Sequence, residues 1–366
     1  MSITNKIVQI VMCALLICLL MTNPAISQET EPLVVHEWGT ITSEHYNNGA
    51  SKGSLNHIRP EEVLPEFVHN MGTVILTKGF SKSPNVSGHP SVTMRLETPV
   101  IYFYPPPSFD LSQPIDVEVE FHGGLINEYY PQAQVMYKNI ETSESGTTYL
   151  TKEALGQLSW KAIHIGGPWP GPETDSSIWL SPREVPSANV QSAEGESERY
   201  LFYRGVANLN SLFTTRHDMN TKEVTFYNPT DLPLLKNNSL TVPSVWIVHI
   251  KDDGTTAFKE IGSIALSDES DKLLTTVSVN FPENEYTLDN LTLLRQSIHK
   301  ALLTAGLFSE EAQAMLKTWE KAYFRNPGTR IFFIVPRDWI DHYLPLKFSV
   351  QVQLERVFIG RIDLVI

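Results

Sequence analysis

Cysteine is nearly absent from this sequence of 366 residues. The two cysteines, Cys13 and Cys18, both lie in the apolar run Ile7–Met21, and small residues follow at a spacing typical of a cleavage site. These proportions predict a secretory signal peptide over residues 1–27. An uncleaved membrane anchor is the alternative, but a spanning helix needs about 20 apolar residues and this run is shorter.

Without its first 27 residues, the chain contains no cysteine at all. It could then form no disulfide, no thiolate metal site and no cysteine nucleophile, which excludes thiol hydrolases, iron–sulfur proteins and zinc ribbons. The predicted signal peptide places the protein outside the cytoplasm, either secreted or periplasmic. Its stability must come from core burial, which a chain of this size can supply.

Basic residues are fewer than acidic ones. The sequence has 28 Lys and Arg and 41 Asp and Glu, which gives a formal net charge of −13. Nucleic acid is excluded as a partner, since its recognition needs a concentrated basic surface. No membrane span is expected once the signal peptide is removed. The sequence also lacks a G-x-S-x-G elbow and a phosphate-binding loop, and no cofactor is predicted. It leaves the oligomeric state open.

Alternating polarity is abundant up to about residue 280. In Asp116–His122, apolar residues occupy every second position, which is the pattern of a half-buried antiparallel strand. Asp253-Gly254 separates two strand-like segments and is a strong hairpin signal, because both residues tolerate positive φ. Pro99 predicts a break, bulge or edge position in the apolar segment Ser91–Tyr104. Many short strands of this kind favour sandwich-like antiparallel sheets.

Helical spacing replaces this pattern near residue 286. Leu291, Leu294, Ile298 and Leu302 recur as on one helix face, and a second helix begins near Ser309. The sequence therefore predicts a mainly β protein with a C-terminal αα-hairpin, α+β overall. We expect a β-rich body over residues 28–285, with residues 286–366 packed on it as one unit.

The densest cluster of chemically capable side chains is near the start of the predicted mature chain. His36 and Glu37 resemble half of a zinc-protease motif, but the second histidine that such a helix needs is missing. A metal-dependent hydrolase using these two residues is therefore a weaker alternative. Seven of the eleven histidines lie in the first half of the chain, without tight ligand spacing, so no metal site is predicted.

Strand-borne arginines and glutamates offer other chemistry. Arg95 and Glu97 are two residues apart, so they share one face of a strand. Arg204 precedes a glycine at a strand end, where a guanidinium can clamp an anionic group. Paired carboxylates hydrolyse glycosidic bonds when they lie roughly 5 to 9.5 Å apart. Tryptophans such as Trp38 can stack on sugar faces, although each is also a normal core residue.

Seven segments together resemble a family of exported bacterial proteins with a V-H-E-W-G-T signature near the mature N-terminus. These segments are Val35–Thr42, Met94–Tyr104, Phe121–Pro131, Leu201–Gly205, Ala305–Trp319, Ile334–Arg337 and Arg356–Arg361. The resemblance implies export and one continuous unit, and it implies no particular activity. It singles out, among the polar and aromatic residues above, His36, Glu37, Trp38, Arg95, Glu97 and Arg204.

These observations predict an exported protein that binds or hydrolyses a glycan or another polymer of the cell envelope or environment. In the enzymatic version, Glu37 and Glu97 are the catalytic carboxylates. His36, Trp38, Arg95 and Arg204 would then bind substrate. The sequence leaves open whether the protein is an enzyme, and the alternative is a non-catalytic periplasmic binding or assembly module.

Overall fold

A computed structural model describes residues 31–55, 63–71, 90–142, 148–236 and 238–365. The predicted signal peptide lies outside this part of the chain. Pro32–Ile366 forms one compact unit, which holds both the strand-rich segment and the C-terminal helices. No helix in the described ranges is both long and apolar enough to cross a membrane.

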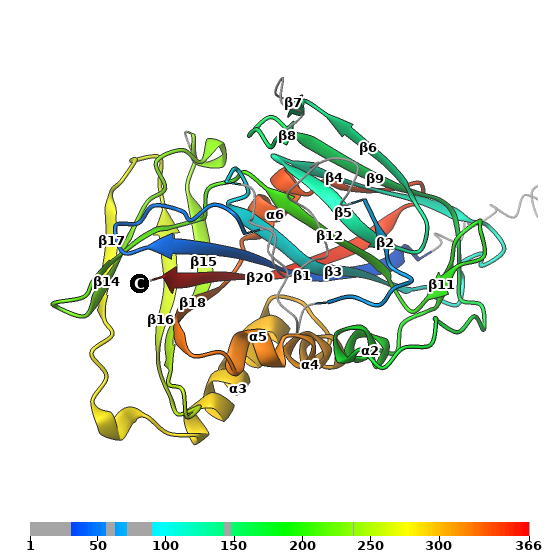
Figure 1. The fold of residues 1–366 in the computed structure, drawn as a ribbon. Helices are drawn as coiled ribbons and strands as arrows, with labels where there is room; N and C mark the ends of the chain where they lie inside the picture. The colour runs from blue at the N-terminus through cyan, green and yellow to red at the C-terminus, as the bar shows by residue number, and fades with distance from the viewer. Residues whose placement is uncertain (1–30, 56–62, 72–89, 143–147, 237, 366) are drawn as a thin grey trace, which may run out of the picture. The chain divides into compact units, whose positions relative to one another are not determined.

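The protein is mainly β and α+β overall, as predicted (Figure 1). Its strands are β1 (Leu33–Tyr46), β2 (His69–Asn70), β3 (Met94–Tyr104), β4 (Ile115–His122), β5 (Gly124–Tyr130), β6 (Gln134–Lys138), β7 (Glu141–Thr142), β8 (Thr148–Tyr149), β9 (Leu155–Ile165), β10 (Val190–Gln191), β11 (Ser197–Glu198), β12 (Leu201–Ala207), β13 (Thr214–Asp218), β14 (Glu223–Tyr227), β15 (Leu240–Ile250), β16 (Thr256–Leu266), β17 (Leu273–Ser278), β18 (Gly328–Ile334), β19 (Leu346–Phe348) and β20 (Val352–Val365). The helices are α2 (Ser177–Arg183), α3 (Asp289–Thr304), α4 (Ser309–Thr318), α5 (Glu320–Phe324) and α6 (Arg337–Tyr343).

A fifteen-stranded sheet dominates the structure. Its main path runs β11-β10-β9-β5-β12-β3-β1-β20-β18-β15-β16, and β2, β4, β6 and β19 attach beside it. Strands β1 and β20 pair in parallel along their whole length, whereas nearly all other pairs are antiparallel. β1 and β20 are neighbours in the centre of this path, so the first and last strands of the compact unit pair with each other.

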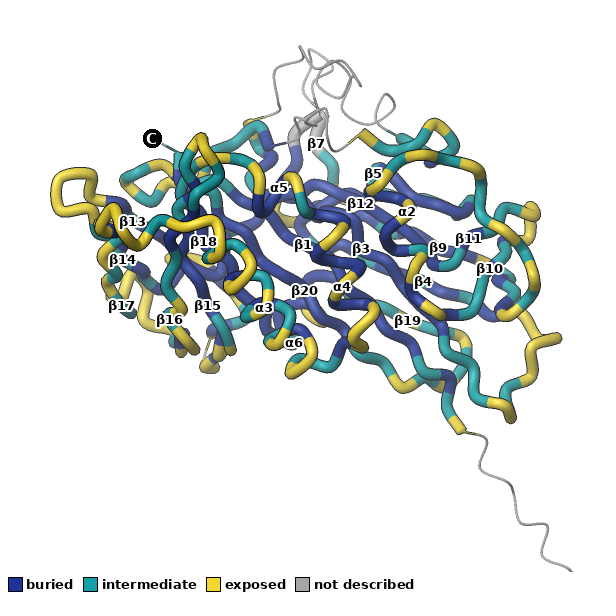
Figure 2. The backbone as a smooth tube through the Cα atoms, turned by 90° about the horizontal axis from the view of Figure 1, so that it is seen from below, coloured by how far each residue is buried: buried dark blue, intermediate teal, exposed yellow. Residues whose placement is uncertain are grey.

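The central strands bury both faces. Helices α2 to α5 cover one face, below the sheet in Figure 1, and pack on a cluster that includes Trp38, Val100 and Phe332. Val35, Ile101 and residues of β4, β9 and α6 form the core on the opposite face. Figure 2 shows β1, β3 and β20 as a buried band behind α3 and α4. We call these two surfaces the helix face and the α6 face.

Several local predictions are confirmed. The alternating segment Asp116–His122 belongs to β4, and the hairpin at Asp253-Gly254 joins β15 to β16, with Gly254 at a φ of +82°. The two predicted C-terminal helices are α3 and α4, which begin at Asp289 and Ser309. Short-range signals were reliable here because caps, turns and alternation act over only a few residues.

Gly360 allows strands β18 and β20 to pack closely. It lies opposite Phe333, and a Cβ atom at Gly360 would approach the Phe333 ring to 2.0 Å. The ring therefore lies across the neighbouring glycine, where any larger residue would collide with it. This contact helps to hold the register that positions the polar side chains of β20.

Candidate functional site

Three of the six predicted site residues lie next to one another on strand β1, and the strand directs them to different faces of the sheet. Successive side chains of a strand point to opposite faces, and here His36 and Trp38 point to the helix face. Glu37 points to the α6 face, where its neighbours are core residues such as Tyr203. His36 and Glu37 therefore cannot approach one metal ion from the same side.

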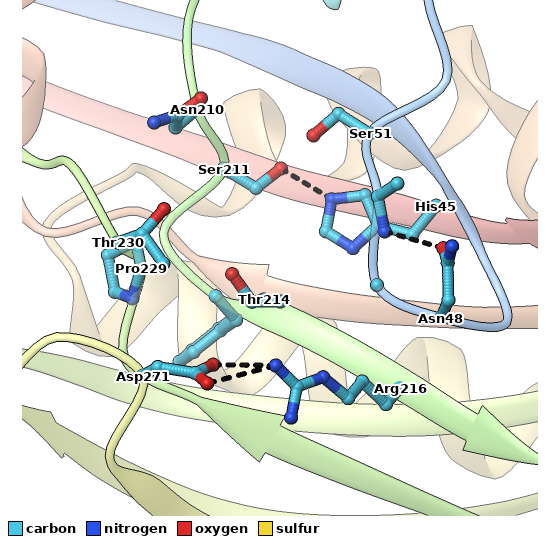
Figure 3. Close-up of a pocket in the computed structure, with 13 residues that line it drawn as sticks. His45, Asn48, Ser51, Asn210, Ser211, Thr214, Arg216, Pro229, Thr230 and Asp271 are labelled. Atoms are coloured by element: carbon cyan, nitrogen blue, oxygen red, sulfur yellow. Dashed lines mark hydrogen bonds and ion pairs between the residues drawn. The ribbon is translucent and has the colours of Figure 1, made fainter.

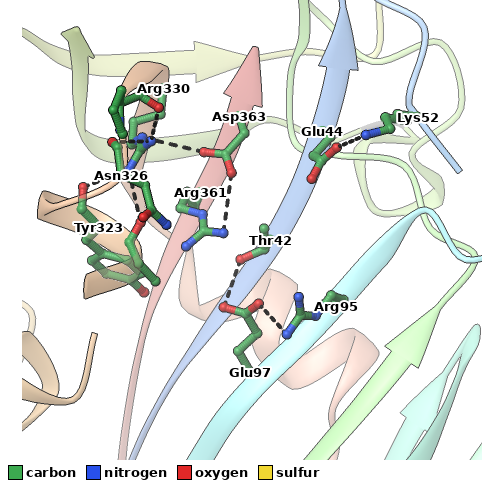
Figure 4. A network of polar contacts seen from close by, with 12 residues as sticks. Thr42, Glu44, Lys52, Arg95, Glu97, Tyr323, Asn326, Arg330, Arg361 and Asp363 are labelled. Atoms are coloured by element: carbon green, nitrogen blue, oxygen red, sulfur yellow. Dashed lines mark hydrogen bonds and ion pairs between the residues drawn. The ribbon is translucent and has the colours of Figure 1, made fainter. Parts of the chain in front are cut away.

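A row of charged side chains crosses the helix face on strands β5, β12, β3, β20 and β18. We call it the charged row, and its members are Glu128, Arg204, Arg95, Glu97, Arg361, Asp363 and Arg330. Strands β5, β12, β3 and β20 overlap segments singled out from the sequence. Three of the predicted residues, Arg95, Glu97 and Arg204, belong to this row (Figure 4 shows all but Glu128 and Arg204).

Charges of the row lie beside opposite charges. Arg95 lies 3.0 Å from a Glu97 oxygen, and Thr42 donates a hydrogen bond of 3.1 Å to the other oxygen of this carboxylate (Figure 4). Arg204 lies 3.3 Å from Glu128 on the adjacent strand. Because buried charges are costly unless they are paired, these contacts explain how the row can lie inside the protein.

Backbone irregularities surround Glu97. The next residue, Thr98, has a φ of +50°, which is uncommon for a β-branched residue. The register between β3 and β1 shifts at this level, and so does the register between β3 and β12 near Gly205. Bulges and strained residues are concentrated at functional sites. This is the best structural reason to regard the centre of the row as more than a packing feature.

Arg330 gives one end of the row a structural role. Its guanidinium donates hydrogen bonds of 2.8–3.2 Å to four backbone carbonyls, those of Ala322, Tyr323, Asn326 and Pro327. The last carbonyls of a helix lack partners within the helix, and a nearby cation stabilises them. Arg330 thus ties the end of α5 to the sheet.

His36 contacts helix α4 on the helix face. Its Nδ1 lies 2.8 Å from Glu311, and the hydroxyl of Tyr104 donates to the same carboxylate at 2.7 Å. The His36 ring also stacks on Phe308, with ring centroids 4.4 Å apart. Burial, followed by the charge of Glu311, raises the pKa of Tyr104 above its usual range. These contacts bind the central strands β1 and β3 to helix α4.

Tryptophans do not form an open stacking surface. Trp38, Trp160 and Trp179 are buried among core residues, whereas Trp169 is only partly buried. A sugar ring could reach none of the three buried indoles. Trp38 is thus a core residue, in contrast to its predicted role in binding substrate.

Glu37 forms a buried ion pair on the α6 face. Arg356 Nε donates to one of its oxygens at 2.6 Å, and Tyr203 donates to the other at 2.5 Å. Arg356 Nη1 also reaches Asp341 at 3.0 Å. Burial alone would lower the pKa of Arg356, but the charge of Glu37 outweighs it and the pKa lies above its usual value.

The predicted pair of catalytic carboxylates is not assembled. Glu37 and Glu97 point to opposite faces of one sheet, and both carboxylates bind an arginine. A glycosidase needs the two groups to flank one glycosidic bond, roughly 5 to 9.5 Å apart, in a space that a sugar can enter. The register of β1 and β3 explains the difference, because Glu37 lies opposite Ile101 whereas Glu97 lies opposite Thr40.

Metal ligands are also dispersed. In the described part of the chain, no three His, Cys, Asp or Glu side chains are grouped as a metal ion requires. His57 and His89 lie outside the described residues. His45 and His122, two other histidines of the first half, contact a threonine and a glutamate respectively.

A cavity of about 360 Å³ adjoins Arg356 where β18 ends. It lies between the start of β15 and strand β20, and is lined by Ser239, Leu240, Thr241, Pro243, Ala305, Ile334, Val335, Pro336, Arg337, Asp338, Arg356 and Val357. Arg356 Nη2 is buried and has no hydrogen-bond partner among the described residues. An unsatisfied buried donor is expensive, and a bound acceptor would relieve this cost.

A second cavity, of about 430 Å³, lies beside the far end of β1 (Figure 3). His45 forms part of its wall, and its ring nitrogens lie 2.7 Å from the Thr215 hydroxyl and 3.2 Å from the Ser211 hydroxyl. Burial lowers the pKa of His45 to about 4, so the ring is neutral at pH 7.

His45 should make the protein less stable in acid. Its unfolded form binds a proton below about pH 6.5, whereas the folded form resists protonation down to about pH 4. Stability is therefore complete above pH 6.5 and falls by about 3 kcal/mol as the pH drops to 4. Urea unfolding between pH 4 and 8 measures this loss. His45→Gln should flatten the curve, leaving the smaller slope from His217, His249 and His342, whose pKa values burial also lowers.

Sequence reasoning missed most partners of the six residues. Arg356 lies within a resemblance segment but was not singled out, and nothing local indicates that it binds Glu37, which is 319 positions away. Glu311 lies in the first turn of the second predicted helix, where nothing local indicates that it contacts His36. Ser211 follows an asparagine in an ordinary loop. In each case the contact is made between distant segments, so no motif spacing could reveal it.

Comparisons with known proteins do not assign this chain to a family. No protein-family model matches the chain, and no curated protein matches it. Among solved structures, it is similar to the Mu homology domain of Fcho1 from Danio rerio with bound Eps15 peptide, at 8% identity and a TM-score of 0.33 over 92% of this chain and 99% of that chain. The yeast delta-COP-I mu-homology domain complexed with Dsl1 WxWxV peptide gives 9% identity and a TM-score of 0.26, over 92% and 97%. Such low TM-scores do not establish a shared fold.

Proposed function

We propose that this protein is an exported glycan-binding protein, secreted or periplasmic, and that a neutral sugar unit binds in the cavity beside Arg356. One observation carries this proposal. Arg356 Nη2 is a buried donor without a described partner, and Arg356 is one of the residues that line the cavity. A sugar hydroxyl or amide oxygen would supply the missing acceptor.

The rest of the cavity suits such a ligand. Its volume of about 360 Å³ falls within the range of small-molecule sites, roughly 300 to 1,000 Å³. Most of its wall is apolar, with a few polar groups from Ser239, Thr241 and Arg337. Small-molecule sites combine these features, because apolar walls supply contact area and polar groups fix the orientation.

Local charge favours a neutral ligand over an acidic one. The cationic Arg356 and Arg337 are already matched by Glu37 and Asp341. Asp338 adds another carboxylate to the cavity wall, and the whole chain is strongly acidic. A negatively charged polymer would thus meet repulsion, whereas a hydroxyl group needs only the Arg356 Nη2 donor, which has no partner among the described residues.

Binding without hydrolysis is the version that this geometry supports. Glu37 is the nearest of the predicted catalytic carboxylates to the cavity, but Tyr203 and Arg356 occupy its two oxygens. Glu97 points to the other face of the sheet. No second carboxylate of the predicted pair can therefore act with Glu37 on one glycosidic bond.

Thr241→Trp provides the direct test, because Thr241 is exposed and lines the cavity. Calorimetry and NMR titration of purified protein with chitotetraose, cellotetraose and maltotetraose should show saturable binding to at least one of them. Tetragalacturonate should bind more weakly. The added indole should fill the cavity and lower the affinity at least tenfold.

Ser263→Trp is the matched control, since it places the same indole on an exposed position of β16 outside the cavity. It should bind as the unmodified protein does. Equal binding by Thr241→Trp and the parent protein would refute the site. Preference for tetragalacturonate would refute the neutral ligand.

A further inference from the structure

We propose that Ser211 and His45 form a nucleophile–base pair that hydrolyses small carboxylic esters in the cavity at the far end of β1. This site is separate from the Arg356 cavity and does not depend on the proposed glycan binding. The two residues come from segments 166 positions apart, and both line a cavity of about 430 Å³.

The geometry has the three parts that an activated serine requires. Ser211 Oγ lies 3.2 Å from His45 Nε2, which is within reach for proton transfer (Figure 3). The other ring nitrogen, Nδ1, lies 2.7 Å from Thr215 Oγ1, so a third group orients the base. Ser43 Oγ lies 2.5 Å from Ser211 Oγ and adds a second hydrogen bond to the nucleophile.

Hydrogen bonding can select the reactive tautomer. When Nδ1 carries the proton and donates it to the Thr215 hydroxyl, Nε2 presents its lone pair to Ser211. Ser43 can then donate to Ser211, whose own proton is directed at His45. Burial keeps the His45 ring neutral at pH 7, so its lone pair is available to accept that proton. The same burial makes the ring a weaker base than an ordinary imidazole, which favours slow turnover.

The cavity wall indicates the substrate class. Phe213 and Pro229 offer apolar surface, while Arg216 lies on the wall and its Nη2 donates to both carboxylate oxygens of Asp271 (Figure 3). This mixture suits a small, uncharged acyl group with a polar alcohol beside it. The volume accommodates a short-chain ester, in line with the usual size of small-molecule sites.

Each bond change is balanced. Ser211 Oγ attacks the ester carbonyl carbon, and its proton moves to His45 Nε2. The C–O bond to the alcohol breaks, and His45 returns the proton to the departing alkoxide. Water then attacks the acyl-serine, gives its proton to His45, and releases the carboxylic acid while Ser211 recovers its hydrogen.

Thr215 stands where a catalytic triad has a carboxylate, so turnover should be slow. A serine hydrolase that loses its aspartate loses roughly 10⁴-fold in rate. We therefore expect hydrolysis of activated esters such as p-nitrophenyl acetate. A fluorophosphonate probe should label the full chain once, and mass spectrometry of the peptides should place the label on Ser211.

Substitutions make the proposal falsifiable. Ser211→Ala should abolish labelling and lower ester hydrolysis at least a hundredfold. Ser263→Ala, which changes an exposed serine of β16 outside the cavity, should leave both unchanged. Thr215→Val should lower the rate about tenfold and Thr215→Ser should restore it, because only the serine keeps the acceptor for Nδ1.

Thermal melting separates chemistry from folding. Ser211→Ala should melt within a few degrees of the parent protein. Labelling at any other residue, unchanged hydrolysis by a folded Ser211→Ala protein, or the absence of labelling in the parent protein would each overturn the proposal. Glycan binding at the Arg356 cavity would survive all three results.

Discussion

Glu37→Gln is expected to lower the free energy of unfolding by about 3–5 kcal/mol. Glu37 is fully buried, and Arg356 Nε donates to it at 2.6 Å. The glutamine keeps the size of the side chain but removes its charge, which leaves a buried guanidinium with poor compensation. Removing one partner of a buried ion pair lowers stability more than removing both, because the remaining charge keeps its desolvation penalty.

Asp341→Asn is the matched control, since Asp341 contacts the same arginine from a position that is 46% exposed. Its loss should cost less than about 1 kcal/mol, because water already screens this contact. Urea unfolding of both variants provides the comparison.

Removing both charges should be milder than removing one. The double variant Glu37→Leu with Arg356→Met should recover much of the stability lost by Glu37→Gln. A double-mutant cycle over these positions measures the coupling. A loss below 1 kcal/mol for Glu37→Gln would show that Arg356 is adequately solvated without its partner.

Glu311→Ala should destabilise the protein by roughly 3–6 kcal/mol, because three donors, one of them buried, lose one buried acceptor. They are the ring of His36 at 2.8 Å, the hydroxyl of Tyr104 at 2.7 Å and the backbone N–H of Phe308 at 2.7 Å. The last contact resembles half of a capping box, in which a glutamate at the third helix position stabilises the helix start. The substitution should therefore also loosen α4.

Glu310→Ala tests the same helix turn without these contacts, because Glu310 is exposed. Its effect should stay within about 0.5 kcal/mol, as is usual for surface positions. Denaturant unfolding measures both variants, and hydrogen exchange of the α4 amides should rise only in Glu311→Ala. Equal effects of the two substitutions would mean that the helix dipole, rather than the contacts with the sheet, accounts for the role of Glu311.

Local elements could be predicted because their causes are local. Alternation in Asp116–His122 indicated β4, and the spacing of Leu294, Ile298 and Leu302 indicated α3. The opposite orientations of His36 and Glu37 also follow from strand geometry alone. The candidate site was predicted less well, because Arg95, Glu97 and Arg204 share the charged row whereas Glu37 lies across the sheet from them.

The sequence by itself determined the class of this protein, mainly β with a C-terminal helical hairpin, and it identified strands in which charged residues interrupt apolar faces. Alternation, helix caps and turns each depend on a few neighbouring residues, so they can be predicted from short stretches of sequence. Only the tertiary structure decided which charges meet. Parallel pairing of β1 with β20 brings Arg356 to Glu37, and packing of α4 brings Glu311 to His36. Contacts between residues hundreds of positions apart depend on strand order and register, which are set by burial of the whole core.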